Sequence, residues 1–600
     1  MQIKSIPTRL TLCCACIAAL LLSSASSNAQ QPNPESASSS SARPLGAISG
    51  RVLNSGGEPL AGAIVYVSTF GTNSGRRATV DASGNFKVDG LDALPYFVWA
   101  SAPGFVSDPV ITPNDARRYY HIGDSVNLTL TKGGVISGNV TSSTNTPVVN
   151  TTVRAFRVRD ENGQPVQSVA QPRDRVSDDR GYYRIYGLPS GSYVISAGGA
   201  GQFSGFMPTQ YEGDAPTYAP SSTRDTASEI VVRGGEEVTA DIQYRGEAGH
   251  SVSGALSGVA PTQAMMFSGS TISLTDLRSR ATVMTTSAGP FNNYGFAFFG
   301  VSDGEYEVFA QRYSSSGETA ISEARRIKVQ GADVTGINLS LFSLASVSGR
   351  LVLESVPKAE CVKRRLVALQ ETVIGARRMS PDMTSRPAVK GQTAMTAVPI
   401  SFSNQTSDSI PDAKGEFILR NLHNGLYRVV AQLPETGWYI RAITMGAPPA
   451  VTKTTDPNIP RDGLTIKTGE KVSGVTVTIT EGAASLRGHL SAREGQRVPA
   501  GLRVYLVPAE RESAENVLRF FESATDTSAG FAIENIAPGR YWLIARAPDD
   551  VDPAKLKPIR QEPALRTRVL REAEALKKEI AFKPCEQTSD YELAWTSTTR

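Results

Sequence analysis

The stretch DAKGEFILRNLHNGLYRVVAQ, residues 412–432, contains the pattern that decides the fold of this 600-residue chain. Asp412 and Gly415 frame a tight turn, because Asp hydrogen-bonds to the turn backbone and Gly accepts the left-handed conformation. Phe417 and Tyr427 each begin an extended segment whose alternate residues are apolar. Alternation places these side chains on one face, so the stretch predicts a β-hairpin with one apolar face.

The same phrase occurs five times along the chain. In each copy an aromatic residue is followed after five residues by an aliphatic one and after ten by Tyr, and four copies have Gly after eight. Recurrence at a regular spacing indicates tandem copies of one structural unit. The copies are Phe86–Leu91–Tyr96, Tyr183–Leu188–Gly191–Tyr193, Phe296–Val301–Gly304–Tyr306, Phe417–Leu422–Gly425–Tyr427 and Phe531–Ile536–Gly539–Tyr541.

A second phrase, with the general form S-G-x-V, begins each unit. It reads ISGRV at 48–52, ISGNV at 136–140, VSGAL at 252–256, VSGRL at 347–351 and LRGHL at 486–490. Short strands separated by turn signals, with no helical period, predict antiparallel β-sandwiches. We therefore predict an all-β chain of five tandem sandwiches, at 45–131, 132–245, 246–342, 343–482 (with a long loop at 375–410) and 483–600.

The last unit differs because its sequence also carries a helical pattern. Over residues 564–580 the apolar residues fall on one helical face, while the charges on the other face are mixed in sign. This pattern predicts an amphipathic helix that covers a sheet rather than a membrane. The residues of the apolar face are Val569, Leu570, Ala573, Leu576 and Ile580.

The first 29 residues have the pattern of a signal peptide. A basic start and a short apolar core precede small residues at Ser27 and Ala29, which predicts cleavage after Ala29. A membrane anchor would need an apolar run of about 20 residues, and a lipoprotein signal is the other alternative. Residues 30–44 are a Ser/Pro-rich linker with nothing to bury. We expect an exported protein, periplasmic or extracellular, with no membrane span after cleavage.

Composition and charge narrow the class of protein further. Hydrophobic residues make up 40% of the chain and charged residues 20%, which is enough to build cores. The net charge is only +4, with no basic patch, so nucleic acid is not an expected partner. The chain after the leader keeps Cys361 and Cys585, which form one disulfide if their domains pack together. Two buried free thiols are the alternative.

Sequence signals for catalysis and metal binding are lacking. The four His residues stand apart and form no H-E-x-x-H pair, and there is no G-x-S-x-G or phosphate-binding loop. The Asp turns lack the alternating ligands and closing Glu of a calcium loop, so we interpret them as turn caps. His423 falls within a turn, where we expect a structural role. We predict neither an enzyme nor a cofactor.

Nearly all of the chain after the leader carries a resemblance to a known family, strongly in units one, two and four and more loosely in units three and five; the first unit shows the motifs. The phrases ISGRV, PLAGAIVYV at 59–67 and TVDASGNF at 79–86, followed by the Tyr96 strand, resemble the carboxypeptidase regulatory-like domain. This resemblance implies a prealbumin-like (transthyretin-like), seven-stranded Greek-key sandwich and a carbohydrate-binding-like scaffold without catalysis of its own. In that family the module accompanies the catalytic domain of metallocarboxypeptidases and precedes some outer-membrane receptors. Neither companion is encoded in this sequence.

Aromatic residues that face away from the core are the candidate binding residues. If Tyr96 points inward, then Phe97 and Trp99 point outward, and Trp542 occupies the position equivalent to Phe97. Exposed aromatic rings can stack on sugars or proteins, although neighbouring units can instead cover them. A second cluster lies in the loop 201–220 and can equally be a packed lid. Its members are Phe203, Phe206, Tyr211 and Tyr218.

These observations predict a non-enzymatic, exported β-sandwich protein with a binding or scaffolding role at the cell envelope. The expected partner is a polysaccharide or an envelope protein. One alternative is a carbohydrate-binding protein that uses the outward aromatics. A more remote one is an accessory or regulatory subunit of a peptidase or an outer-membrane receptor.

Overall fold

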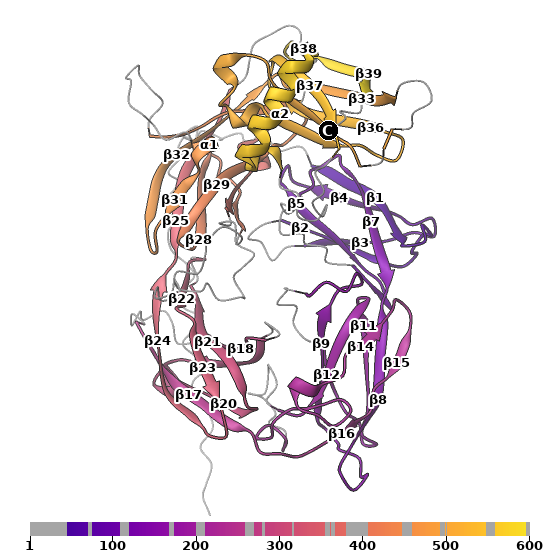
Figure 1. Ribbon diagram of the computed structural model, residues 1–600, viewed down its shortest axis with the longest axis vertical. Coiled ribbons are helices and arrows are strands. Elements are labelled where there is room, and N and C mark those ends of the chain that lie inside the picture. Colours follow the sequence, from indigo (N-terminus) through magenta and orange to yellow (C-terminus); the bar gives the residue numbers. More distant parts are fainter. Residues whose placement is uncertain are drawn as a thin grey trace, which may run out of the picture. The chain divides into compact units, whose positions relative to one another are not determined.

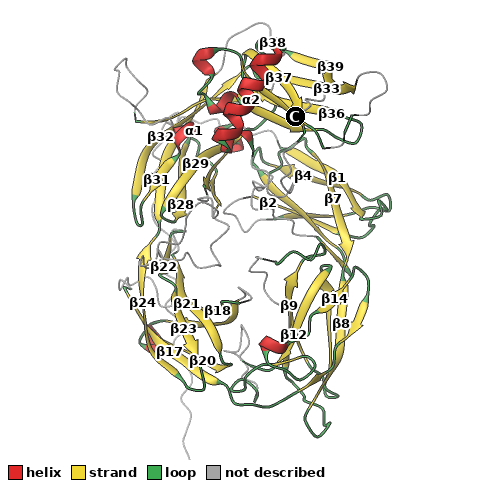
Figure 2. Ribbon diagram, viewed as in Figure 1, coloured by secondary structure: helices red, strands yellow, loops and turns green. Residues whose placement is uncertain are grey.

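A computed structural model shows an all-β protein (Figures 1 and 2). It describes residues 45–69, 75–107, 119–166, 173–199, 210–258, 269–278, 282–314, 317–354, 361, 367–379, 406–446, 459–492, 498–499, 501–547 and 558–595. The predicted leader and linker lie outside the described residues. Five sandwiches follow one another, numbered here 1 to 5 along the chain, which confirms the predicted fold class.

Sandwich 4, which contains the stretch 412–432, shows the plan of the repeat. One sheet has the strand order β28-β25-β32-β30 and the other β27-β26-β29-β31. The strands are β25 (Ala345–Glu354), β26 (Val373–Arg378), β27 (Thr406–Ser409), β28 (Glu416–Leu422), β29 (Gly425–Gln432), β30 (Trp438–Met445), β31 (Leu464–Ile466) and β32 (Lys471–Glu481), with the short helices η3 (Leu369–Glu371) and α1 (Ile459–Asp462).

The predicted hairpin is wrong, because β28 and β29 belong to opposite sheets. β28 pairs with β25, whereas β29 pairs with β26 and β31. The phrase is therefore a corner that carries the chain across one end of the sandwich, with both apolar faces meeting in the core. Apolar residues that recur with a period of two predict which face of a strand is buried. They do not predict which other strand is its hydrogen-bonding partner. The predicted loop 375–410 also proves too long, since β26 continues to Arg378 and β27 begins at Thr406.

The other sandwiches follow the same plan, and in each the strands of the repeated phrase lie in different ladders. Sandwich 1 contains β1 (Gly46–Asn54), β2 (Ile64–Thr69), β3 (Arg76–Thr79), β4 (Asn85–Leu91), β5 (Tyr96–Ser101), β6 (Phe105–Val106) and β7 (Ser125–Lys132). Sandwich 2 contains β8 (Gly134–Thr141), β9 (Thr152–Arg159), β10 (Arg173–Val176), β11 (Tyr182–Leu188), β12 (Gly191–Ala197), β13 (Thr217–Tyr218), η1 (Arg224–Thr226), β14 (Ile230–Val232), β15 (Glu237–Thr239) and β16 (Ile242–Gln243).

In sandwich 3, β22 pairs with a strand of each half and so joins the two sheets into one. Its elements are β17 (His250–Ser257), β18 (Ser270–Asp276), β19 (Thr282–Ala288), η2 (Pro290–Asn292), β20 (Gly295–Val301), β21 (Gly304–Tyr313), β22 (Thr319–Ser322), β23 (Arg325–Val329) and β24 (Val334–Ser343). Sandwich 5 contains β33 (Ala484–Ala492), β34 (Arg503–Pro508), η5 (Arg511–Ser513), η6 (Val517–Arg519), β35 (Phe521–Ala524), β36 (Gly530–Ile536), β37 (Gly539–Arg546), η8 (Ile559–Gln561), α2 (Pro563–Leu576), β38 (Glu579–Phe582) and β39 (Gln587–Trp595).

The first and last strands of each sandwich run parallel, which the prediction of purely antiparallel sheets missed. The parallel pairs are β1 with β7, β8 with β15 and β16, β17 with β24, β25 with β32, and β33 with β39.

The two repeated phrases meet at a glycine that faces an aromatic ring. In sandwich 4, Gly349 of β25 is the cross-strand partner of Phe417. A Cβ atom on Gly349 would overlap the carbonyl oxygen of Val475 in the parallel strand β32. Only Gly permits this close approach, which explains the Gly of the S-G-x-V phrase. The same pairing occurs in all five sandwiches, as Gly50–Phe86, Gly138–Tyr183, Gly254–Phe296, Gly349–Phe417 and Gly488–Phe531.

The Tyr that ends each phrase forms a hydrogen bond with the backbone of the corner between the two sheets. The hydroxyl of Tyr541 donates to the carbonyl of Ala537, four residues earlier, at 2.6 Å. Tyr96, Tyr193 and Tyr306 make the same bond to the carbonyls of Asp92, Pro189 and Ser302. In sandwich 4 the hydroxyl of Tyr427 instead accepts from the backbone N–H of His423. A buried hydroxyl needs such a partner, so Tyr serves here where Phe would leave a backbone group unpaired.

The Asp turns are built as predicted. The Oδ1 atom of Asp412 accepts the N–H groups of Lys414 and Glu416 at 2.8 and 2.9 Å. Asp81, Asp178 and Asp526 accept two backbone N–H groups in the same way. The bond from the Asn85 N–H holds the pKa of the Asp81 carboxyl below its usual value. In Asp526 the Ser528 hydroxyl, followed by the Gly530 N–H, lowers the pKa in the same way.

The C-terminal helix α2 covers a sheet, although it is shorter than predicted. It lies against β37 and β34 (Figure 1). Val569 and Ala573 are fully buried, whereas Leu576 is exposed. The helix ends at Lys577, which takes a left-handed conformation, and Ile580 belongs to the strand β38. The predicted end at 580 is therefore wrong, since no Gly or Pro signals the stop.

The junctions between sandwiches are short in three of four cases. One residue, Gly133, separates β7 from β8, and one residue, Leu344, separates β24 from β25. Gly482 and Ala483 separate β32 from β33, whereas the segment 244–249 separates β16 from β17. A disulfide between Cys361 and Cys585, with Cα atoms 5.4 Å apart, also links sandwich 4 to sandwich 5.

Candidate functional site

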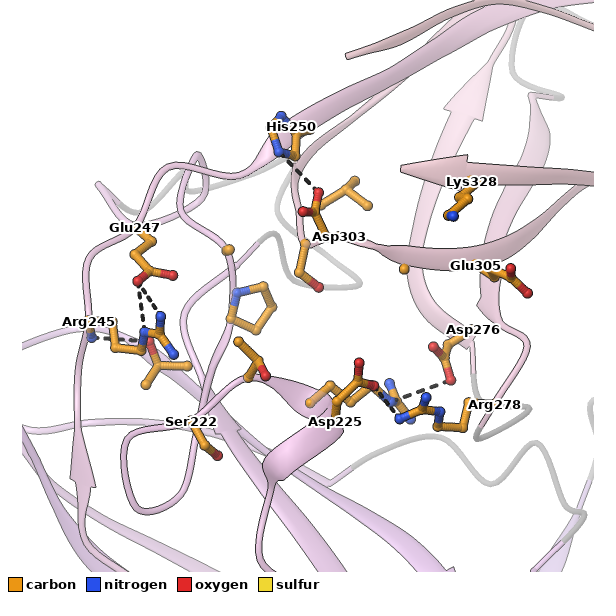
Figure 3. A pocket seen from close by; sticks show the side chains of 18 of the residues that line it. Ser222, Asp225, Arg245, Glu247, His250, Asp276, Arg278, Asp303, Glu305 and Lys328 are labelled. Carbon is orange, nitrogen blue, oxygen red and sulfur yellow. Dashed lines mark hydrogen bonds and ion pairs between the residues drawn. The ribbon is translucent and has the colours of Figure 1, made fainter. Parts of the chain in front are cut away.

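A polar pocket of about 690 Å³ lies between sandwiches 2 and 3, at the longest junction (Figure 3). Sandwich 2 contributes residues 215–217 and 222–225, around β13 and η1. The junction after β16 contributes Arg245, Glu247 and Ala248. Sandwich 3 contributes the start of β17, the end of β18 and the turn between β20 and β21. Each wall therefore ends in loops that carry charged side chains.

Two ion pairs join the two sandwiches across the floor of the pocket. Arg224 Nε lies 3.4 Å from Asp276 Oδ2, and both side chains are largely buried. The next residue along, Asp225, pairs with Arg278 in an exposed position. The Arg224 guanidinium also lies 5.9 and 6.0 Å from the ring centres of Phe156 and Tyr218. Low exposure strengthens the inner pair, whereas the outer one is screened by solvent.

The side walls carry further pairs of polar and charged side chains (Figure 3). His250 Nε2 lies 3.3 Å from Asp303 Oδ1, and Arg245 Nε donates to Glu247 Oε1 at 2.9 Å. Lys328 and Glu305 face each other in the register of β23 and β21. Positive and negative groups are thus nearly matched, so the pocket presents no strong field of one sign to a ligand.

The charged side chains of this pocket connect sandwich 2 to sandwich 3. Its arginines and carboxylates are engaged with one another, and two of the pairs link residues about 50 positions apart in sequence.

Across the described ranges, no group of three or more His, Cys, Asp or Glu side chains is arranged to hold a metal ion. In the same part of the chain, no helix has the length and apolar character needed to cross a membrane.

Sequence reasoning missed this pocket, because none of the predicted site residues that the structure describes lines it. The predicted residue Tyr218 is 3% exposed and lies behind Arg224, and burial raises its pKa. Tyr211 is half-buried and makes an edge contact with Tyr244 at 5.4 Å between ring centres. These two residues therefore pack as a lid on sandwich 2. Phe203 and Phe206 lie outside the described residues.

The three predicted outward aromatics have different surroundings. Trp99 is 43% exposed and stacks on Tyr66, with ring centres 5.4 Å apart. Phe97 is half-buried against Tyr119, at 4.6 Å between ring centres. Tyr119 in turn donates its hydroxyl to Asp408 of sandwich 4 at 2.9 Å. Of Phe97 and Trp99, only Trp99 therefore has a ring that is open to solvent.

Trp542 is half-buried, and the C-terminal helix contributes to the cluster against which it packs. It packs at the edge of a cluster that includes Val569 and Ala573 of α2. The equivalent residue of sandwich 4, Arg428, is 7% exposed and donates to the carbonyl of Arg560 in sandwich 5 at 2.6 Å. The outward position of this strand thus serves packing between elements. No local signal in the sequence gives this packing, since it depends on tertiary contacts.

His423 is buried in its corner, and burial together with the nearby Arg378 lowers its pKa to about 4. It is therefore neutral near pH 7, in agreement with a structural role. Neither His423 nor the Cys361–Cys585 disulfide lines the pocket between sandwiches 2 and 3.

Comparison with known proteins identifies the first sandwich. Residues 47–120 match the family model of the carboxypeptidase regulatory-like domain. The resemblance inferred from the repeated phrases is thereby confirmed. No curated protein matches the chain.

Solved structures that are similar to this chain have low sequence identity to it. The Bacillus anthracis TIE protein is 15% identical over 50% of this chain and 50% of its own, with a TM-score of 0.14. BcpA, the major pilin subunit of Bacillus cereus, is 13% identical over 50% of this chain and 99% of its own, with a TM-score of 0.14. Two B repeat units of the Staphylococcus aureus collagen-binding protein are 11% identical over 73% of this chain and 100% of their own, also with a TM-score of 0.14.

Proposed function

We propose that this chain is an exported, non-enzymatic scaffold of the cell envelope, which holds its five sandwiches in fixed relation to their neighbours. The observation that carries the proposal is the passage of the chain from the last strand of one sandwich into the first strand of the next. At Gly133, Leu344 and Gly482–Ala483 this passage takes only one or two residues. So short a link leaves few backbone angles free.

The junction between sandwiches 2 and 3 is longer, and ion pairs between side chains restrict its motion in place of a short link. The Arg224–Asp276 and Asp225–Arg278 pairs join sandwich 2 to sandwich 3. The Cys361–Cys585 disulfide adds a covalent link between sandwiches 4 and 5. Stiff spacing between modules suits a protein that presents or separates binding surfaces at the envelope.

Distances between spin labels test the stiffness. The two cysteines after the predicted leader, Cys361 and Cys585, are paired, so cysteines introduced into the mature chain can be labelled selectively. Glu161→Cys combined with Lys87→Cys reports on the junction between sandwiches 1 and 2, and Glu318→Cys with Lys414→Cys on that between sandwiches 3 and 4. We expect narrow distance distributions for both. Broad distributions, as from a flexible tether, would contradict the scaffold proposal.

Location and lack of catalysis need separate measurements. Fractionation of cells that express the full chain should place the cleaved protein outside the cytoplasm. Incubation with peptide, ester and glycoside substrates, with and without added zinc, should give no turnover. Retention of an uncleaved chain in the cytoplasm would overturn export, and zinc-dependent turnover would overturn the non-enzymatic assignment.

Carbohydrate binding through Trp99 is a second candidate, supported by its open ring stacked on Tyr66. A glycan array with the wild type and Trp99→Ala tests it. Phe97→Ala and Trp542→Ala are the comparison variants, because these rings are half-buried whereas that of Trp99 is exposed. Equal binding by Trp99→Ala and the wild type would exclude Trp99 as the sugar contact.

A further inference from the structure

One strand of sandwich 2 differs from its four equivalents on the side that faces away from the core. In β11 the outward positions are occupied by Tyr182, Arg184 and Tyr186. Tyr183, which lies between Tyr182 and Arg184, points into the core and is 1% exposed. The equivalent outward positions are Asn85, Lys87 and Asp89 in sandwich 1, Gly295, Ala297 and Phe299 in sandwich 3, Glu416, Ile418 and Arg420 in sandwich 4, and Gly530, Ala532 and Glu534 in sandwich 5. A pair of outward tyrosines is therefore no requirement of the fold.

Both tyrosine rings are open to solvent. Tyr182 is 39% exposed and Tyr186 is 51% exposed. They stand four residues apart on one face of a strand, which separates them by about 13 Å at the usual rise of a β-strand. Arg175 of β10 lies over the Tyr186 ring at 4.6 Å and thereby restricts its orientation. Exposed aromatic rings in fixed positions are typical of binding surfaces.

The charge of Arg184, between the two rings, is balanced by that of Glu237. Arg184 donates from Nε and Nη2 to the two carboxylate oxygens of Glu237 at 3.1 and 3.0 Å. Arg184 lies between the tyrosines along β11, whereas Glu237 stands on β15, two strands away and in register with Tyr186. Both side chains are half-exposed, and their planar groups keep free hydrogen-bonding capacity. Bonds from Arg184 and Ser137 lower the pKa of Glu237, so its carboxylate stays ionised as an acceptor. The strand β8 beside β11 adds the exposed Asn139.

We propose that this face of sandwich 2 binds a neutral oligosaccharide chain. The rings of Tyr182 and Tyr186 stack on the apolar faces of two sugar units, and Arg184 with Glu237 hydrogen-bonds to the hydroxyl groups between them. A sugar chain alternates apolar faces with hydroxyl edges, which matches a surface that alternates aromatic rings with planar polar groups. The site goes beyond the scaffold role and does not depend on the stiffness of any junction.

A protein partner fits this surface less well. Protein interfaces have a continuous apolar centre from which charges are depleted, whereas here the charged Arg184 lies between the two rings. The paired charges of Arg184 and Glu237 do not favour an acidic polymer, and the Arg175 cation beside Tyr186 makes such a polymer the necessary comparison in the test. Charge complementarity and spacing therefore both favour a neutral polyhydroxyl ligand.

The test uses the full mature chain and soluble neutral polysaccharides: a mixed-linkage β-glucan, a xylan and a galactomannan, with polygalacturonate as the acidic comparison. Affinity electrophoresis and calorimetry measure binding by the wild type, the Tyr182→Ala/Tyr186→Ala double variant and the Tyr182→Phe/Tyr186→Phe double variant. Lys87→Ala changes the equivalent face of sandwich 1 and is the matched control. All changed side chains are exposed, and circular dichroism checks that the fold is intact.

We expect at least one neutral polysaccharide to bind, with affinity reduced at least tenfold in the double Ala variant. The double Phe variant and Lys87→Ala should retain binding, since rings can stack without a hydroxyl and sandwich 1 takes no part. Three results would overturn the proposal: no binding to any neutral polysaccharide, equal binding by the double Ala variant, or preferential binding of polygalacturonate. Loss of binding in Trp99→Ala, with the double Ala variant unaffected, would place the sugar site on sandwich 1 instead.

Discussion

Replacement of Tyr541 by Phe tests whether the corner tyrosines hold the sandwiches together. The Tyr541 side chain is completely buried, and its hydroxyl donates to the Ala537 carbonyl at 2.6 Å. Phe keeps the ring between Phe521 and Phe582, so no cavity forms. What is lost is the donor to a buried carbonyl, which costs about 1–3 kcal/mol. At 25 °C this corresponds to a roughly 5- to 150-fold rise in the population of the locally opened state.

Hydrogen exchange of the backbone amides in β36 and β37 is the suitable assay, because a chain of five sandwiches does not unfold in one step. The amides of these strands should exchange about 5- to 150-fold faster in Tyr541→Phe than in the wild type. Tyr591→Phe in the same sandwich is the matched control, because the structure shows no hydrogen bond from the Tyr591 hydroxyl to any described residue, and its exchange should stay unchanged. If the two variants exchange alike, the corner bond contributes nothing and the reasoning fails.

Three further changes test other parts of the fold. Gly349→Ala should destabilise sandwich 4 by about 1–3 kcal/mol, because the new methyl group overlaps a carbonyl of the neighbouring parallel strand, and an unchanged melting profile would contradict this. Burial raises the pKa of Tyr306 and Tyr541 to about 12, against about 10 in the unfolded chain. The stability from each is therefore complete below pH 10 and falls by roughly 3 kcal/mol as the pH rises to 12; an ultraviolet titration in which all tyrosines ionise near pH 10 without unfolding would refute it. Cys361→Ser should lower the melting temperature of sandwiches 4 and 5 while leaving sandwich 1 unchanged, and calorimetry that shows no shift in any transition would argue against a stabilising disulfide.

The sequence contains most of the information about strands and turns. The recurring Asp, Gly and aromatic residues give the five units, the Asp turns and the buried face of each strand, because these depend on neighbours within about ten residues. The pairing of strands is less accessible. β28 and β29 looked like a hairpin because a period of two is the same whether two strands share a sheet or face each other across a core.

The candidate sites depended on contacts that no local pattern contains. Trp542 occupies the same position as Phe97, yet it packs against a cluster to which α2 contributes, and this helix lies more than 20 residues further on. Arg224 meets Asp276 across a junction, with no spacing rule to link them. By contrast, the outward tyrosines at 182 and 186 could have been found from the sequence, by comparing the outward residues of all five copies and not only the inward ones.

The parallel pairing of first and last strands has a mechanical consequence. In each sandwich the chain enters at one end of this pair and leaves at the opposite end, as in β1 and β7. Tension along the polypeptide therefore slides the two strands past each other and loads all hydrogen bonds of the ladder at once. Bonds loaded together resist far more force than bonds broken one after another. We therefore expect each of the five sandwiches to resist unfolding when the chain is pulled from its two ends.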